Sequence, residues 1–77
     1  MTYTAQDIRL ATKLLQRGYK YVIRDQSGDV FVCKTEPARD YMFDIFIFHY
    51  DDRKIPSRYF KPVVKKAVKL TDILLTE

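Results

Sequence analysis

The alternation of hydrophobic and polar positions is clearest between residues 18 and 34, where two runs of β-branched and aromatic residues flank a polar break. Asp25 begins the break and Gly28 ends it three residues later. This pair is typical of a type I turn, because Asp bonds its own backbone and Gly adopts the left-handed conformation that follows. The pattern predicts a β-hairpin with one dry and one mixed face, whose second strand ends before Pro37.

The N-terminal segment carries apolar side chains three and four positions apart, which predicts an amphipathic helix over residues 2–17. Thr4 is the expected N-cap, and Asp7 stands at the position of its capping-box partner. Gly18 is expected to end the helix. The face that would cover a sheet consists of Ile8, Ala11, Leu14 and Leu15.

Residues 41–50 are the most apolar segment of the chain, and both alternating faces carry bulky side chains. The aromatic and β-branched residues and the short length favour a strand over a helix. A strand that is apolar on both faces would aggregate at an exposed edge. We therefore expect this strand to be central in the sheet or covered on both faces.

The C-terminal third leaves two interpretations open after a polar connection that begins at Asp51. Residues 58–64 can form a fourth strand, which Pro62 would confine to an edge, or Pro62 can begin a helix at its first position. The apolar residues of 62–75 fall within an arc of about 160° on a helix. This periodicity favours a C-terminal helix over residues 62–75, although its three valines lower the helix propensity.

Together these elements predict one α+β domain over residues 1–77: a small antiparallel sheet of three strands, or four, with an N-terminal and a C-terminal helix packed on it. Hydrophobic residues make up 47% of the chain, enough for a core that buries about 60–65% of the surface exposed on unfolding. The lone Cys33 has no disulfide partner within the chain. With no leader and no run of the ~18–20 apolar residues that span a bilayer, we expect a cytoplasmic protein without a membrane partner.

Residues that could support catalysis are few. His49 is the only histidine, and it has Asp51 but no nucleophile near it in sequence; Cys33 lies in a predicted strand, as a packed thiol would. One histidine and one cysteine are too few for a structural zinc site, and two glycines form no phosphate-binding loop. We expect a protein that is not an enzyme and has no metal or cofactor.

Charge is distributed unevenly. The formal net charge is +4, and half of the fourteen basic side chains lie between residues 53 and 71, a span without any acidic residue. Tyr59 and Phe60 interrupt these cations, and basic residues beside aromatics can hold phosphates and stack on bases or dock an acidic protein patch. The same lysines also suit the solvated face of a helix without a dedicated partner. The candidate binding residues are Arg53, Lys54, Arg58, Tyr59, Lys61, Lys65, Lys66 and Lys69.

The hairpin and the C-terminus also carry a resemblance. The pattern Leu-Leu-x-x-Gly-Tyr-Lys-Tyr-Val-Ile-Arg-Asp-x-x-Gly-x-Val-Phe-Val, a following Pro37 and a closing Asp-Ile-Leu-Leu resemble small accessory proteins of phages and prophages of Gram-positive bacteria. The resemblance covers residues 14–37 and 72–75. It implies a mobile-element setting rather than an activity, and it favours a strand over a helix near residues 59–64.

These observations lead to two functional hypotheses. The first is a non-catalytic interaction protein that binds and modulates a host or phage protein through the basic C-terminal surface, for example in host takeover or anti-defence. The second is a DNA- or RNA-binding accessory protein that uses the same residues. Under either hypothesis we expect the protein to be a monomer or a homodimer. A homodimer would form through the second apolar face of the strand at residues 41–50.

Overall fold

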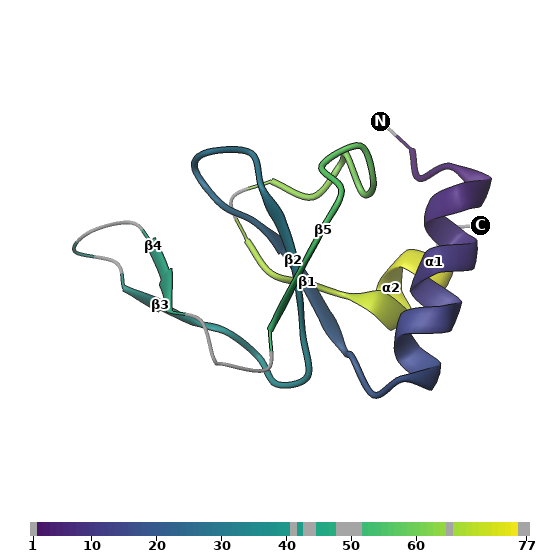
Figure 1. Cartoon of the computed structure of the whole chain (residues 1–77), viewed down its shortest axis with the longest axis horizontal. Coiled ribbons are helices and arrows are strands. Elements are labelled where there is room, and N and C mark those ends of the chain that lie inside the picture. The colour runs from purple at the N-terminus through teal and green to yellow at the C-terminus, as the bar shows by residue number, and fades with distance from the viewer. Residues whose placement is uncertain (1, 41, 43–44, 48–51, 65, 76–77) are drawn as a thin grey trace.

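The computed structural model is a small α+β fold built on a four-stranded antiparallel sheet, with a helix at each end of the chain (Figure 1). It describes residues 2–40, 42, 45–47, 52–64 and 66–75. In chain order the elements are α1 (Ala5–Gln16), β1 (Tyr21–Arg24), β2 (Val30–Cys33), β3 (Ala38–Asp40), β4 (Ile45–Ile47), β5 (Arg53–Ile55), β6 (Val68–Lys69) and α2 (Leu70–Leu75).

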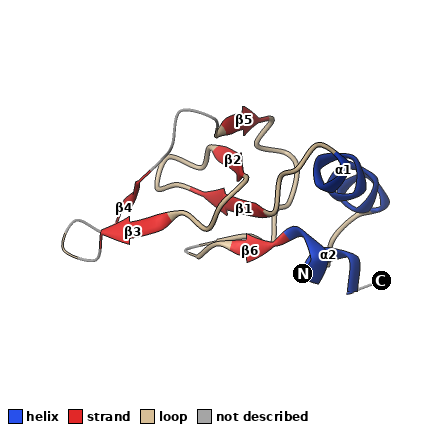
Figure 2. Ribbon diagram, turned by 90° about the horizontal axis from the view of Figure 1, so that it is seen from below, coloured by secondary structure: helices blue, strands red, loops and turns tan. Residues whose placement is uncertain are grey.

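The order of strands in the main sheet is β5-β2-β1-β6, so that the hairpin forms its centre and the two C-terminal strands form its edges. β3 and β4 pair with each other in a separate two-stranded sheet. Both views place the helices on one side of the main sheet and the β3–β4 pair on the other (Figure 1; Figure 2). The fold class predicted from the sequence is confirmed.

The predicted N-terminal helix forms as α1, with both of its ends set by local sequence. The Thr4 hydroxyl accepts the Asp7 N–H, and the Asp7 carboxylate accepts the Thr4 N–H, which completes a capping box. At the other end Gly18 has φ +94°, and the N–H of Tyr19 donates to the carbonyl of Leu14 at 3.0 Å. This is the Schellman arrangement that glycine favours.

The hairpin forms at the predicted residues, with the predicted turn from Asp25 to Gly28. The N–H of Gly28 donates to the Asp25 carbonyl at 3.1 Å, and Gly28 has φ +93°. Val22 lies opposite Val32 in the ladder, and both are fully buried on the face that the helices cover. Ile23 and Cys33 point to the other face and are fully buried as well. Both faces are therefore dry at the centre of the sheet, where the sequence predicted one dry and one mixed face, because the hairpin is central and not half-covered.

The main core lies between the sheet and the helices. The helices contribute buried apolar residues on facing sides, and the sheet contributes its valines. Phe60 and Val63, which belong to neither sheet nor helix, are fully buried in the same cluster. The helical and sheet members are Ala11, Leu14, Val22, Val30, Val32, Leu70 and Ile73.

Of the two arrangements predicted for the strand at residues 41–50, the central position in the main sheet is wrong, and coverage of both faces lies outside what the structure describes. The described part of this strand, β4 at Ile45–Ile47, pairs with β3 outside the main sheet and not at its centre. Pro37 accounts for the difference, because it ends the ladder after β2 and the chain begins a new strand directly after it. The side chains of the segment and its remaining residues, except Met42, lie outside the described part.

The predicted helix over residues 62–75 is wrong for the described residues before Leu70. Tyr59 and Val63 close two turns, so that residues 58–64 are neither an edge strand nor the start of a helix. Val68–Lys69 form β6, which pairs with β1, and the helix begins only at Leu70. The free edge of β1 offers backbone hydrogen bonds to β-branched residues that favour a strand, and this outweighs the helical periodicity. The fourth strand of the sheet, β5, lies in what the sequence indicated as a polar connection.

Candidate functional site

The candidate site is the segment that follows the edge strand β5. Residues 57–61, here called the basic loop, carry Arg58, Tyr59 and Lys61. The N–H of Tyr59 donates to the Pro56 carbonyl at 3.2 Å, which closes the first turn of the loop. Arg58 and Lys61 are exposed, and Tyr59 is half-buried. The loop therefore presents two cations and part of an aromatic ring to solvent.

Phe60 anchors the basic loop in the core. Its φ of +54° lies in the left-handed region, where a bulky residue costs about 1–3 kcal/mol. The ring is fully buried, and it packs edge-on against Tyr3 with 6.4 Å between the ring centroids. Burial of the phenol, followed by the nearby carboxylates of Asp7 and Asp72, raises the pKa of Tyr3 above its ordinary value. Burial of the Phe60 ring, worth about 1.5–3 kcal/mol, offsets the backbone strain.

Asp7 joins the start of α1 to the basic loop. One carboxylate oxygen accepts the Thr4 N–H of the capping box at 3.0 Å, and the other accepts the N–H of Phe60 at 3.0 Å. The Asp7 residue is only 3% exposed. A buried carboxylate is stable when N–H donors satisfy its oxygens, and bonds of this charge-assisted kind are stronger than neutral ones. Asp7 thus fixes the backbone at the residue that carries the strain.

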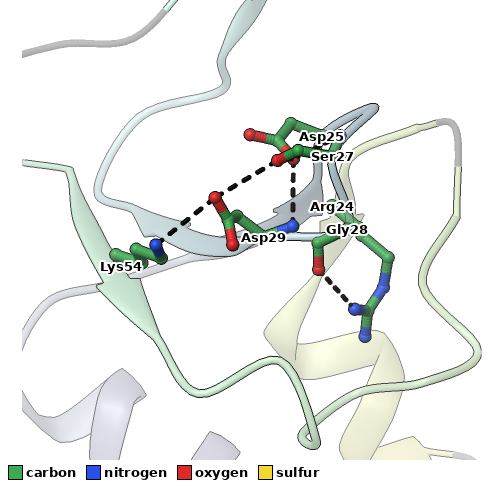
Figure 3. Close-up of polar contacts among 6 residues, drawn as sticks. All are labelled: Arg24, Asp25, Ser27, Gly28, Asp29 and Lys54. Carbon is green, nitrogen blue, oxygen red and sulfur yellow. Dashed lines mark hydrogen bonds and ion pairs between the residues drawn. The ribbon is translucent and has the colours of Figure 1, made fainter.

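Arg24 fixes the basic loop from the opposite side. Its guanidinium donates hydrogen bonds of 2.8–3.2 Å to five backbone carbonyls. One belongs to the hairpin turn, and four belong to the loop and the residues that follow it. Figure 3 shows the bond to the hairpin turn. The acceptors are the carbonyls of Gly28, Ser57, Tyr59, Phe60 and Val63.

Arg58 and Tyr59 form a stacked pair at the outer surface of the loop. The guanidinium carbon of Arg58 lies 4.7 Å from the centroid of the Tyr59 ring, and Nη2 donates to the Tyr59 hydroxyl at 3.2 Å. Cation–π contacts of this kind contribute about 0.5–1 kcal/mol at exposed sites. The pair orients a charged group whose remaining N–H donors point to no described carboxylate within ion-pair distance.

The hairpin turn next to the loop is acidic and internally bonded (Figure 3). The Asp25 carboxylate accepts the Ser27 hydroxyl at 2.6 Å and the Asp29 N–H at 3.0 Å. Slight desolvation acts to raise the pKa of Asp25, but the bonds from the Ser27 hydroxyl and from the backbone N–H groups of the turn outweigh it and lower the pKa below its ordinary value. Asp29 forms an ion pair of 3.3 Å with Lys54, whose side chain is 61% exposed.

The sequence-predicted binding residues fall into two groups. Arg53 and Lys54 on β5 continue directly into the basic loop, so these two residues lie on one segment with Arg58, Tyr59 and Lys61. Lys69 lies on β6 at the opposite edge of the sheet, and the exposed Lys66 precedes it. Three inter-strand steps separate the two edges, about 14 Å. Lys65 lies outside the described residues.

The residues with possible catalytic chemistry, Cys33, His49 and Asp51, do not join the candidate site among the described residues. Cys33 is fully buried in β2, as expected for a packed thiol, and His49 and Asp51 lie outside the described residues. Among the described residues no group of three His, Cys, Asp or Glu side chains could hold a metal ion. In the same part of the chain, no helix has the length and apolar composition to cross a membrane.

Two charged residues that shape the loop, Asp7 and Arg24, are not among the binding residues predicted from the sequence. Asp7 was identified as a helix cap but not as the acceptor of the Phe60 N–H, since nothing in the sequence links positions 53 residues apart. Arg24 shares a strand face with the fully buried Val22, and an arginine on the core side of a strand is the signal that could have indicated a buried contact. Comparison with protein-family models, curated proteins and solved structures gives no match for this chain.

Proposed function

We propose that this protein is a non-catalytic binding module that recognises an acidic surface on a partner protein. The recognising surface consists of β5 and the basic loop, and its central feature is the stacked Arg58–Tyr59 pair. Arginine and tyrosine are the residues that most often dominate binding energy at protein interfaces. Their side chains stand here on a backbone that needs no reordering on binding, which lowers the entropic cost.

The charges around the loop favour a protein partner over a nucleic acid. Asp29 already pairs with Lys54, and the acidic hairpin turn lies beside the loop because Arg24 binds carbonyls of both. Mixed charges of this kind suit a protein partner with a complementary pattern, whereas carboxylates beside the cations repel the phosphates of a polyanion. One face of the Tyr59 ring also carries the Arg58 guanidinium, which leaves it unavailable for stacking on a base.

Nucleic-acid binding is the second candidate function, and the observation in its favour is the run of seven cations without an acidic residue between residues 53 and 71. It predicts that log K falls with log salt by about 0.7–0.9 for each phosphate neutralised. A labelled 20-base-pair duplex and a single-stranded RNA of mixed sequence at ~50 mM salt serve as probes. The resemblance to phage accessory proteins is compatible with both candidate functions. If the partner is a protein, we propose that binding modulates a host or phage protein.

The test uses the purified full chain as bait in a Gram-positive bacterial lysate. Each captured protein is identified, purified and titrated by calorimetry against the wild type and the triple variant Arg53→Ala, Arg58→Ala, Lys61→Ala. A matched control removes three exposed cations from α1 and its C-cap through Arg9→Ala, Lys13→Ala and Arg17→Ala.

We expect the triple variant to bind at least tenfold more weakly, and the α1 control to bind within twofold of the wild type. Equal losses in both triple variants would indicate attraction by net charge alone and would contradict a dedicated surface. A duplex or RNA that binds with the expected salt dependence, in the absence of any protein partner, would favour the second candidate instead.

A further inference from the structure

We propose that Arg58, stacked on Tyr59, is a preformed receptor for a single carboxylate of an acidic segment in the partner protein, and that Arg24 and Asp7 are positioning residues that hold it in shape. This inference rests on the proposed function and deepens it. Most of the affinity is assigned to the Arg58 side chain. Arg24 and Asp7 determine how the basic loop orients that side chain.

The first supporting observation is the conformation of Phe60. A non-glycine residue with φ +54° is retained only where its surroundings determine it, and such residues gather at binding and active sites. Here the strained residue directs its ring into the core while the preceding Arg58 and Tyr59 remain at the surface. Within three residues, the strained backbone thus places Phe60 in the core and Arg58 at the surface.

The second observation is the use of the two interior charges. Arg24 directs its guanidinium at backbone carbonyls, although the acidic turn that holds Asp25 and Asp29 lies next to it. Asp7 directs one carboxylate oxygen at the Phe60 N–H. Hydrogen bonds from charged groups to the backbone fix its dihedral angles without prescribing the side chains. Both residues thus determine the shape of the loop, and neither competes with a ligand for Arg58.

The third observation is the geometry of Arg58 itself. One of its terminal nitrogens donates to the Tyr59 hydroxyl, and the stacking on the ring holds the guanidinium plane in place. An arginine has five N–H donors in a planar fork, and a carboxylate accepts two of them side by side. The side chain is exposed, and the described residues offer it no carboxylate. Its free donors match one carboxylate from outside.

A single carboxylate suits the surroundings better than a chain of phosphates. Asp25 has a lowered pKa and is ionised at neutral pH, so the turn beside the loop carries negative charge. A segment with one acidic side chain can approach Arg58 while its other residues contact the rest of the loop. A polyphosphate backbone places a charge every few ångströms and would meet this turn.

The test begins with a displayed library of random 12-residue peptides, selected against the full chain. For each selected peptide with an Asp or Glu, fluorescence polarisation measures Kd with the acid intact and replaced by its amide, against the wild type and Arg58→Ala. We expect a loss of at least tenfold for either change alone, and little further loss when both are combined, since the two groups contact each other. Arg58→Lys is expected to lose nearly as much, because an ammonium cannot bind bidentately.

Two controls separate the possible failures. Arg17→Ala, an exposed arginine outside the loop, is expected to leave Kd unchanged, and so is the double change Lys66→Ala, Lys69→Ala at the other edge of the sheet. If the peptide acid is coupled to Lys66 and Lys69 instead of Arg58, this inference is wrong while the proposed function survives. If no acidic peptide is selected and the 20-base-pair duplex binds with dependence on Arg58, both are wrong.

The positioning role has its own measurement. In Arg24→Lys the charge remains, but the ammonium cannot reach five carbonyls; the coupling between Arg58 and the peptide acid is expected to fall at least fivefold in a chain that circular dichroism shows to be folded. An unchanged coupling would contradict the role of Arg24. Asp7→Asn leaves one oxygen where two accept the N–H groups of Thr4 and Phe60, so one of these bonds is lost, and it provides the same readout where Arg24→Lys does not fold.

Discussion

Replacing Arg24 by methionine is the perturbation that bears most directly on how the basic loop is held. Methionine keeps the approximate length of the side chain, which shares a strand face with the buried Val22, but removes all donors. The hydrogen bonds to the five carbonyls of the hairpin turn and the loop are lost together. The effect on stability depends on which of these carbonyls find another donor.

Two of the five carbonyls keep a partner. That of Phe60 also accepts the N–H of Val63 at 2.9 Å, and the bond to the carbonyl of Ser57 lies at the exposed surface, where water can replace it. The other three lie in partly buried surroundings, and a lost bond there costs about 1 kcal/mol. The expected loss is about 3 kcal/mol of the roughly 4–12 kcal/mol available to a domain of this length.

This loss is measured by urea unfolding at pH 7 and by thermal melts followed by circular dichroism. A loss of about 3 kcal/mol corresponds to a fall in Tm of about 12–24 °C for a chain of this size. Arg17→Met, an exposed arginine at the end of α1, is the matched control and is expected to change stability by less than about 0.5 kcal/mol. If Arg24→Met lowers Tm by less than about 4 °C, the guanidinium does not hold the loop as described.

Three further predictions concern single residues. Thr4→Ala removes the side-chain acceptor of the capping box and is expected to cost about 1 kcal/mol in urea unfolding, whereas an unchanged midpoint would contradict the cap. Gly28→Ala meets no atom within 4 Å but must adopt φ +93°, so we expect a loss of about 1 kcal/mol from the backbone alone, against none if the turn rearranges freely. Because the pKa of Asp25 is lowered in the folded state, its ionised form contributes stability that is present above the ordinary value of 3.8 and is lost as pH falls through the folded-state pKa. The stability difference between wild type and Asp25→Asn should therefore shrink below about pH 4 in unfolding titrations, and a difference that is constant from pH 2 to 7 would contradict this assignment.

The parts of the fold that the sequence predicted are those determined by neighbouring residues. The capping box at Thr4 and the glycines at positions 18 and 28 set the ends of α1 and the hairpin turn within a few residues of each other. These signals act through local backbone geometry and need no tertiary partner. The N-terminal helix and the hairpin with its turn followed from them.

The C-terminal third could not be predicted in this way, because contacts from distant elements decide it. Val68 and Lys69 have a helical pattern around them but pair with β1, whose free edge is known only once the sheet exists. Phe60 adopts a left-handed conformation since Asp7, 53 positions earlier, binds its N–H. Intrinsic propensity is a weak guide wherever such tertiary bonds compete with it.

In the candidate site, too, the residue types could be predicted from the sequence, whereas their arrangement depends on contacts between distant elements. The sequence indicated the composition of the candidate site, a row of cations interrupted by aromatics that includes Arg58 and Tyr59. It did not predict that β5 and β6 lie at opposite edges of the sheet, which divides the cations. The position of Arg24 on the core side of its strand could have indicated a buried contact, but not the partners, because backbone carbonyls belong to residues of every type.

The most direct test of the central claim, that the basic loop recognises an acidic partner, is a titration of the ¹⁵N-labelled chain with a selected acidic peptide, followed by NMR. We predict that the largest shifts occur in the amide signals of Arg58, Tyr59 and Lys61 and in the side-chain Nε–H of Arg58, with Lys66 and Lys69 unaffected. Shifts centred on Lys66 and Lys69, or a loop that stays silent while the peptide binds, would contradict the claim.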